Sequence, residues 1–98
     1  MKLQFSHQAD HDLDRLYSFL IKNKASLRTA DKAILAIKKG AKQLLDNPEL
    51  GISLDDSIER REWSVPFGKR AYILRYIPDY EDKVIRVLRI WHSREDRD

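Results

Sequence analysis

The chain has 98 residues, of which 42% are hydrophobic and 36% charged, with a net charge of +3 and no cysteine. This composition is that of a folded globular protein, and the length predicts one domain, residues 1–98. The lack of cysteine excludes disulfides, thiolate catalysis and cysteine-bound metals. No apolar run is long enough for a signal peptide or a membrane span, so we expect a cytoplasmic protein.

The first third of the chain predicts a short strand followed by a helix. Lys2–Phe5 alternates polar and apolar residues, which is typical of an edge strand. Ser6 offers a side-chain oxygen to the first N–H groups of a helix that we expect to end near Asn23. The residues at helical spacing predict its buried stripe. They are Leu13, Leu16, Tyr17, Leu20 and Ile21, and the other faces carry Asp10, Asp14, Arg15, Ser18 and Lys22.

A second amphipathic helix is predicted from about Leu27 to Asp46, with Asn47-Pro48 ending it because proline excludes helical geometry before it. The short polar link between the two helices indicates a helical hairpin. The polar stretch Glu49–Glu59 that follows predicts a loop. The expected buried stripe of the second helix consists of Ala30, Ala33, Ile34, Ile37, Ala41, Leu44 and Leu45.

Three strand-like runs complete the chain: 60–65, 69–77 and 83–91. Turns are predicted at 65–68 and 78–82, because both contain proline and the first also contains glycine. The order β-α-α-β-β-β predicts an α+β fold in which the helical hairpin packs on an antiparallel sheet. The first strand is expected to join the edge of this sheet.

Arginines and one histidine are the main candidates for function. Strand alternation places Arg70 on one face of its strand and Arg75 on the other, and places Arg89 with Ile85, Val87 and Trp91. Arginines among apolar neighbours are costly unless they are paired, so the simplest interpretation is ion pairing with Glu62, Asp79 or Glu81 on a half-exposed sheet. The other interpretation is a surface that grips an anionic or acidic partner.

His92 is the only imidazole in the C-terminal half, and a general base working near neutral pH favours this side chain. A histidine at a strand end is also commonly a polar cap. His7 and His11 stand four residues apart on the first predicted helix, but no third ligand lies at a helpful spacing, so we predict no metal site. We expect no cofactor either, since no glycine-rich phosphate loop is present.

Several of these segments resemble the RelE/ParE toxin superfamily. They are Phe5-Ser6 at the start of the first helix, residues 45–51 (LDNPELG) at the end of the second, and above all residues 87–94 (VLRIWHSR). The last segment is similar to the ParE branch, whose members commonly end a strand with a comparable run. The resemblance implies the toxin of a type II toxin–antitoxin pair, bound by a cognate antitoxin in a hetero-oligomer.

The superfamily implies two possible mechanisms. ParE-like members poison DNA gyrase by protein contact, and here the resemblance implies target-binding residues in the last strand and tail: Arg89, Trp91, His92, Arg94 and Arg97. RelE-like members cleave mRNA on the ribosome, which needs a base and cations around the phosphate. In that case His92 is the candidate base, and Arg70 or Arg75 the phosphate clamp.

The sequence departs from the RelE pattern at three points. Tyr72 stands where RelE-like enzymes hold a clamping arginine, Ser93 follows His92 where several RNases have a tyrosine, and only Lys69 precedes Arg70. These departures favour gyrase over the ribosome and mRNA as the target. A third alternative is a diverged α+β module without toxicity. The antitoxin is expected to carry an acidic amphipathic segment that folds as it binds, on a face that the sequence does not identify.

Overall fold

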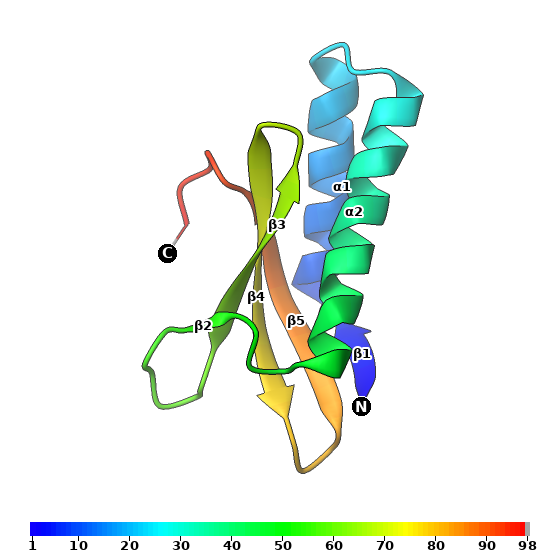
Figure 1. Ribbon diagram of the computed structural model, residues 1–98. Helices are drawn as coiled ribbons and strands as arrows, with labels where there is room; N and C mark the ends of the chain where they lie inside the picture. The colour runs from blue at the N-terminus through cyan, green and yellow to red at the C-terminus, as the bar shows by residue number, and fades with distance from the viewer. Residues whose placement is uncertain (98) are drawn as a thin grey trace.

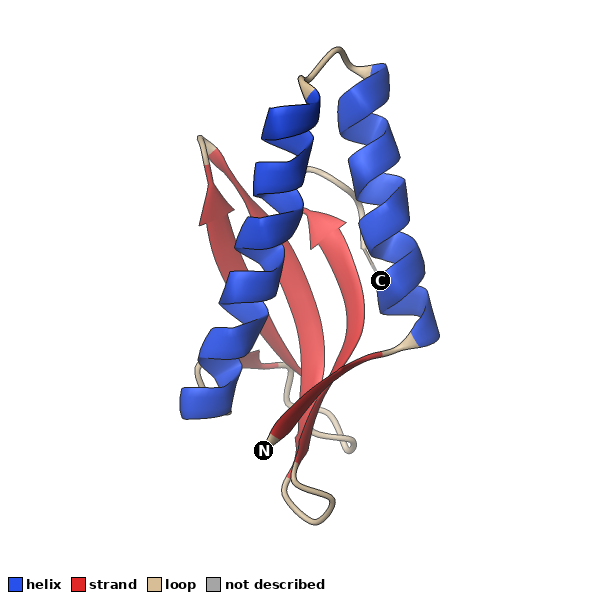
Figure 2. Ribbon diagram, turned by 90° about the vertical axis from the view of Figure 1, so that its right-hand side faces the viewer, coloured by secondary structure: helices blue, strands red, loops and turns tan. Residues whose placement is uncertain are grey.

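The computed structural model describes residues 1–97. Its two helices lie side by side along one face of a five-stranded sheet whose strand order is β1-β5-β4-β3-β2 (Figures 1 and 2). This arrangement confirms the predicted α+β fold. The elements are β1 (Lys2–Phe5), α1 (His7–Lys22), α2 (Leu27–Asp46), β2 (Ile52–Ser53), β3 (Arg61–Phe67), β4 (Arg70–Asp79) and β5 (Val84–His92).

The sheet is mixed rather than antiparallel throughout. β3, β4 and β5 form the predicted antiparallel meander, and β1 joins the edge as expected, but β1 runs parallel to β5. A parallel neighbour requires a long connection, which the two helices and the meander supply. β2 lies inside the stretch predicted as a loop and pairs antiparallel with β3. Two residues are too few to show strand alternation in a sequence, so β2 was not predicted.

Both helices begin and end near the predicted residues. The Ser6 side chain accepts a hydrogen bond from the Ala9 N–H at 3.0 Å, which confirms the expected N-cap. α2 has the predicted bounds and ends at the cap residue Asn47. The stripe of α1 differs from the prediction because Ile21 is exposed. Its turn lies near the helical connection, where the hairpin extends beyond the strands (Figure 1).

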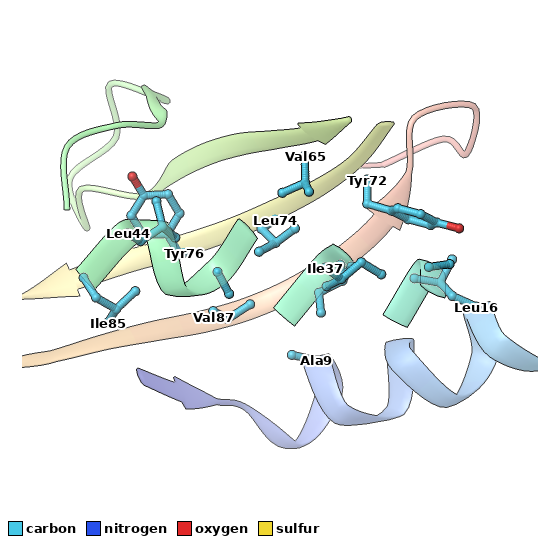
Figure 3. Close-up of a cluster of buried hydrophobic side chains, with 13 residues drawn as sticks. Ala9, Leu16, Ile37, Leu44, Val65, Tyr72, Leu74, Tyr76, Ile85 and Val87 are labelled. Carbon is cyan, nitrogen blue, oxygen red and sulfur yellow. The ribbon is translucent and has the colours of Figure 1, made fainter. Parts of the chain in front are cut away.

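The core lies between the helices and the sheet, and Figure 3 shows its side chains pointing from both layers toward each other. α2 approaches β3 closely at Gly40, where an added Cβ would lie 2.3 Å from a Val65 methyl carbon. The Tyr76 hydroxyl donates to the Pro48 carbonyl at 2.7 Å and accepts from the Gly51 N–H at 2.9 Å. The loop that follows α2 is thereby tied to the middle of the sheet.

One irregularity in β5 decides which residues face the solvent. Arg75 pairs with Arg89 and the next residue of β4 pairs with Val87, so Leu88 is an extra residue that forms a bulge. Ile85 and Val87 therefore share the buried face with Ile90, while Arg89 points to the opposite face. The prediction that Arg89 lies with Ile85 and Val87 was wrong, because one inserted residue reverses the alternation.

Candidate functional site at the free edge, open face and carboxyl end of β5

The free edge of β5 begins where its parallel neighbour stops. β1 ends at Phe5, opposite Val87, and no other strand within residues 1–97 pairs with the rest of β5 on that side. Ser6 takes over the pairing: its N–H donates to the Val87 carbonyl at 2.9 Å, and its hydroxyl donates to the Leu88 carbonyl at 2.8 Å. The same hydroxyl caps α1, so a single serine joins the start of the helix to the bulge.

Asp12 of α1 continues this edge. Its carboxylate is 3% exposed and accepts the Ile90 N–H at 2.8 Å and the Arg89 Nε at 2.9 Å. Arg15 donates to the Ile90 carbonyl at 3.1 Å. Burial raises the pKa of Asp12, but the hydrogen bonds from Arg89 and Ile90 and the charges of Arg89 and Arg15 outweigh burial and hold the pKa below its ordinary value. Two side chains of α1 therefore replace the missing strand and cover a sheet edge.

A second carboxylate organises the open face of the sheet, the face without helices. Glu62 of β3 accepts two hydrogen bonds from Arg75, at 2.8 and 3.0 Å, and three from Arg97, the shortest at 2.9 Å. Burial again raises the pKa of Glu62, yet the bonds and charges of Arg97 and Arg75 leave it below the ordinary value. The C-terminal segment thus crosses to the face opposite the helices, as Figure 1 shows.

Trp91 lies on the open face near the end of β5. The residue is 5% exposed, and the guanidinium groups of Arg75 and Arg89 lie 4.7 and 4.9 Å from the centre of its ring. Such cation–π contacts stabilise both partners when they are shielded from water. Trp91, Arg75 and Arg89 therefore form one packed unit, with Glu62 and Asp12 neutralising the two cations.

The carboxyl end of β5 presents a different set of side chains. Leu16 and Phe19 of α1 line a hollow of about 390 Å³ together with Arg70, His92, Arg94 and Glu95. Phe19 is 59% exposed, which leaves an apolar surface beside two cations. Since Ser93 hydrogen-bonds to the backbone of Ala71 beside Arg70, the chain after β5 is held against the start of β4.

His92 is fixed from several directions. Its ring lies edge-on to Tyr72, with 5.5 Å between ring centres, and its Nδ1 accepts the Arg94 N–H at 3.1 Å. The His92 N–H donates to Glu95 at 2.8 Å, and Glu95 is itself ion-paired with Arg15. The imidazole therefore lies in a defined position in which Nδ1 acts as an acceptor.

The structure separates the predicted site residues into two groups. Arg70, His92 and Arg94 share the hollow at the end of the sheet. The others, Arg75, Arg89, Trp91 and Arg97, belong to the open face. Of the carboxylates expected to pair with the strand arginines, Glu62 pairs with Arg75, whereas Arg89 pairs with Asp12, which was not among them.

Sequence reasoning missed Asp12, although its position carried a signal. Asp12 lies three residues after Ala9 and four before Leu16, two buried residues of α1, so it falls in the middle of the buried stripe. An acidic residue at such a position needs a cationic or N–H partner. In the structure, Arg89 and the Ile90 N–H of the last strand are these partners.

Within residues 1–97, no three His, Cys, Asp or Glu side chains come close enough together to hold a metal ion, and His7 and His11 remain a pair without a third ligand. None of the helices in the same range is long and apolar enough to cross a membrane.

A β-meander backed by a helical hairpin is a fold that this chain shares with solved chains of two toxin–antitoxin systems. A profile for the family described as "ParE toxin of type II toxin-antitoxin system, parDE" matches residues 3–97. The chain therefore belongs to the ParE toxin family of type II toxin–antitoxin systems.

Its similarity to known proteins extends over nearly the whole chain. Toxin RelE1 of Caulobacter vibrioides is 32% identical over 92 residues, which cover 94% of this chain and 92% of the relative. The chromosomal ParDE system of P. aeruginosa contains a chain with a TM-score of 0.73 and 22% identity, with coverage of 94% and 95%. A chain of the toxin–antitoxin complex RelBE2 of Mycobacterium tuberculosis has a TM-score of 0.61 and 22% identity, and the match covers 94% of this chain and 96% of that chain. These two structures share the fold.

Proposed function

We propose that this toxin inhibits DNA gyrase by protein contact and that a cognate antitoxin neutralises it. The contact surface is the hollow at the carboxyl end of β5, where Arg70, His92 and Arg94 surround the exposed ring of Phe19. An aromatic side chain with arginines beside it is the composition of protein–protein hot spots. Arg89, Trp91 and Arg97 act behind this surface by holding the strand and the tail in place.

The position of Arg75 removes one of the two candidate phosphate clamps and so supports a mechanism without cleavage. Cleavage of mRNA requires a base and a phosphate clamp around the same phosphate. His92 and Arg70 lie at the end of the sheet, whereas Arg75 lies on the open face, has a side chain 11% exposed and donates two hydrogen bonds to Glu62. An arginine neutralised in this way is a poor clamp for an incoming phosphate.

The antitoxin is the second partner in this proposal. The neighbours in P. aeruginosa and M. tuberculosis are described as a toxin–antitoxin system and complex, and the shared fold supports the same kind of partner here. We expect an acidic amphipathic segment of the antitoxin to fold on the toxin surface and to give a hetero-oligomer. Copurification from cells that express both genes, followed by mass measurement, tests this expectation.

A supercoiling assay with purified gyrase tests the main proposal. The wild-type toxin should block supercoiling, and Arg94→Glu should reduce the block at least tenfold because it reverses one charge of the contact surface. Lys42→Glu is the matched control, since it makes the same charge change at an exposed position of α2. Unaltered supercoiling with excess wild-type toxin would exclude gyrase as the target.

Ribosome-dependent mRNA cleavage is the second candidate. Two observations favour it: the relative in C. vibrioides is named Toxin RelE1, and Arg70, Arg94 and His92 line one hollow. Primer extension on cellular mRNA after brief induction distinguishes the two functions. Cuts within translated codons that disappear with His92→Gln would establish mRNA cleavage by the toxin. Intact transcripts would exclude this function.

A further inference from the structure

The outer face of the helical hairpin points away from the sheet, toward the viewer in Figure 2. It contains a hollow of about 480 Å³ between α1 and α2. Leu35 of α2 lines this hollow with 54% of its surface exposed, beside the half-buried Ile34 and Leu13 of α1. Apolar surface therefore extends across both helices, and charged residues border it. An exposed apolar patch with a polar rim is typical of a contact with another macromolecule.

The charges on this face are divided between the two helices. α1 carries Asp10 and Asp14 on successive turns, and α2 carries Arg28, Lys32 and Lys39 at spacings of four and seven residues. Like charges four residues apart destabilise a helix. These five side chains are exposed, and none of them forms an ion pair or a side-chain hydrogen bond within residues 1–97. Their charges are therefore available to a partner.

The two helices run in opposite directions, which fixes the residues that lie at the same height. α1 ends at Lys22 and α2 begins at Leu27, so residues equally far from the connection lie level with each other. Asp10 precedes the end of α1 by the same number of residues by which Lys39 follows the start of α2. Asp10 and Lys38 both line the hollow, as this correspondence requires. The acidic part of α1 is thus level with a basic part of α2.

From this arrangement we propose that the isolated toxin forms a homodimer through the outer faces of two helical hairpins. A two-fold axis parallel to the helices sets α1 of each copy against α2 of the other, with residues at matching heights. Asp10 of each copy then pairs with Lys39 of the other, and Leu35 of each copy covers the other copy's hollow. The four helices form an antiparallel bundle with an apolar centre.

The size of the face predicts a weak dimer. At about 1.5 Å per residue, α1 is about 24 Å long, and two adjacent helices are about 20 Å wide, so each copy contributes about 500 Å². Interfaces of this size belong to complexes that form and dissociate readily, and we expect a dissociation constant in the micromolar range. The inference does not depend on the cellular target of the toxin.

The mixed charge of the face argues for a second copy over a nucleic acid. Exposed lysines attract the phosphates of DNA and RNA. The carboxylates of Asp10, Asp14 and Asp31 line the hollow beside these lysines and repel phosphates. A surface with both signs of charge is complementary to itself when a two-fold axis brings the acidic helix onto the basic one.

Sedimentation velocity of the full-length toxin, purified without an antitoxin, tests the proposal over a range of micromolar concentrations. The mass of the wild type should double as the concentration rises. Asp10→Lys and Lys39→Asp should each weaken the dimer at least about tenfold, because the two-fold axis repeats every repulsive contact. Both positions are exposed, and circular dichroism confirms that the variants are folded.

The double variant Asp10→Lys/Lys39→Asp exchanges the two charges and should restore the dissociation constant to within about threefold of the wild type. Lys83→Asp makes the same charge change in the turn before β5 and should alter it less than about twofold. A monomeric wild type at the highest concentration, or no recovery in the double variant, would overturn the proposal. A labelled DNA duplex that binds the monomeric wild type but not Lys39→Asp would also overturn it, in favour of a nucleic-acid surface.

Discussion

The two faces of the sheet are stabilised by different physical means. The face beneath the helices is apolar, and α2 approaches it through small residues, with Gly40 against Val65. The open face and the free edge of β5 are held by arginines paired with Glu62 and Asp12. Apolar packing is non-directional and is set by volume, whereas the ion pairs are directional and fix individual strands. The first face maintains the fold, and the second determines where the C-terminal strand and tail lie.

Removing core volume should have the largest effect on stability. Leu74 is fully buried at the centre of β4, so Leu74→Ala leaves a cavity between the sheet and the helices. We expect a loss of about 4 kcal/mol in the free energy of unfolding, measured by urea denaturation. A loss below about 1 kcal/mol would mean that the helices collapse onto the cavity and that the packing is loose.

Asp12→Ala should cost nearly as much and would test the free edge of β5 directly. It leaves the Ile90 N–H and the Arg89 guanidinium without their shared acceptor, and breaking a buried pair in this way costs about 3 kcal/mol. Asp14→Ala, two residues away at an exposed position, is the control and should change stability by less than about 0.5 kcal/mol. Similar values for the two variants would show that the Asp12 network is not needed.

Gly40→Ala should destabilise the protein by about 2 kcal/mol, although alanine ordinarily favours a helix by about 1 kcal/mol over glycine. The reason is the overlap of the new Cβ with the methyl groups of Val65. The variant Gly40→Ala/Val65→Ala should recover part of this loss, because the shortened side chain makes room. A double-mutant cycle by thermal denaturation measures the coupling, and additive effects would contradict the close approach.

Acid should weaken the ion-paired face selectively. The pKa values of Asp12 and Glu62 lie below their ordinary values of 3.8 and 4.5 in the folded state. Their contribution to stability is therefore complete above the ordinary values and is lost as the pH falls through the folded values. Between pH 6 and pH 3, Asp12→Asn should lose less free energy of unfolding than the wild type does, while Asp14→Asn should follow the wild type. An equal loss of the free energy of unfolding between pH 6 and pH 3 in all three proteins would contradict this prediction.

Much of the fold followed from periodicity, since the hydrophobic spacing of α2 and the Asn47-Pro48 stop gave its bounds. The bulge at Leu88 could not be predicted from periodicity, because one extra residue leaves no mark in the composition. It becomes visible only when β5 is paired with β4. The contact between Asp12 and Arg89 depends on this bulge, which places Arg89 on the open face of the sheet. Long-range pairs of this kind can be predicted only when the register of the sheet is known. The sequence therefore identified four candidates without showing that they divide between two surfaces: Arg70, Arg75, Arg89 and His92.

The most direct test of the account is growth after induction of the toxin without an antitoxin, comparing the wild type with Arg94→Glu and Lys42→Glu. Arg94 is exposed at the hollow beside His92, and its side chain forms no ion pair or hydrogen bond with another of the described residues, 1–97. The variant should therefore stay within about 0.5 kcal/mol of wild-type stability. We predict that Arg94→Glu allows growth while the wild type and Lys42→Glu arrest it. Growth arrest by a folded Arg94→Glu protein, equal to that of the wild type, would contradict the assignment of toxicity to the carboxyl end of β5.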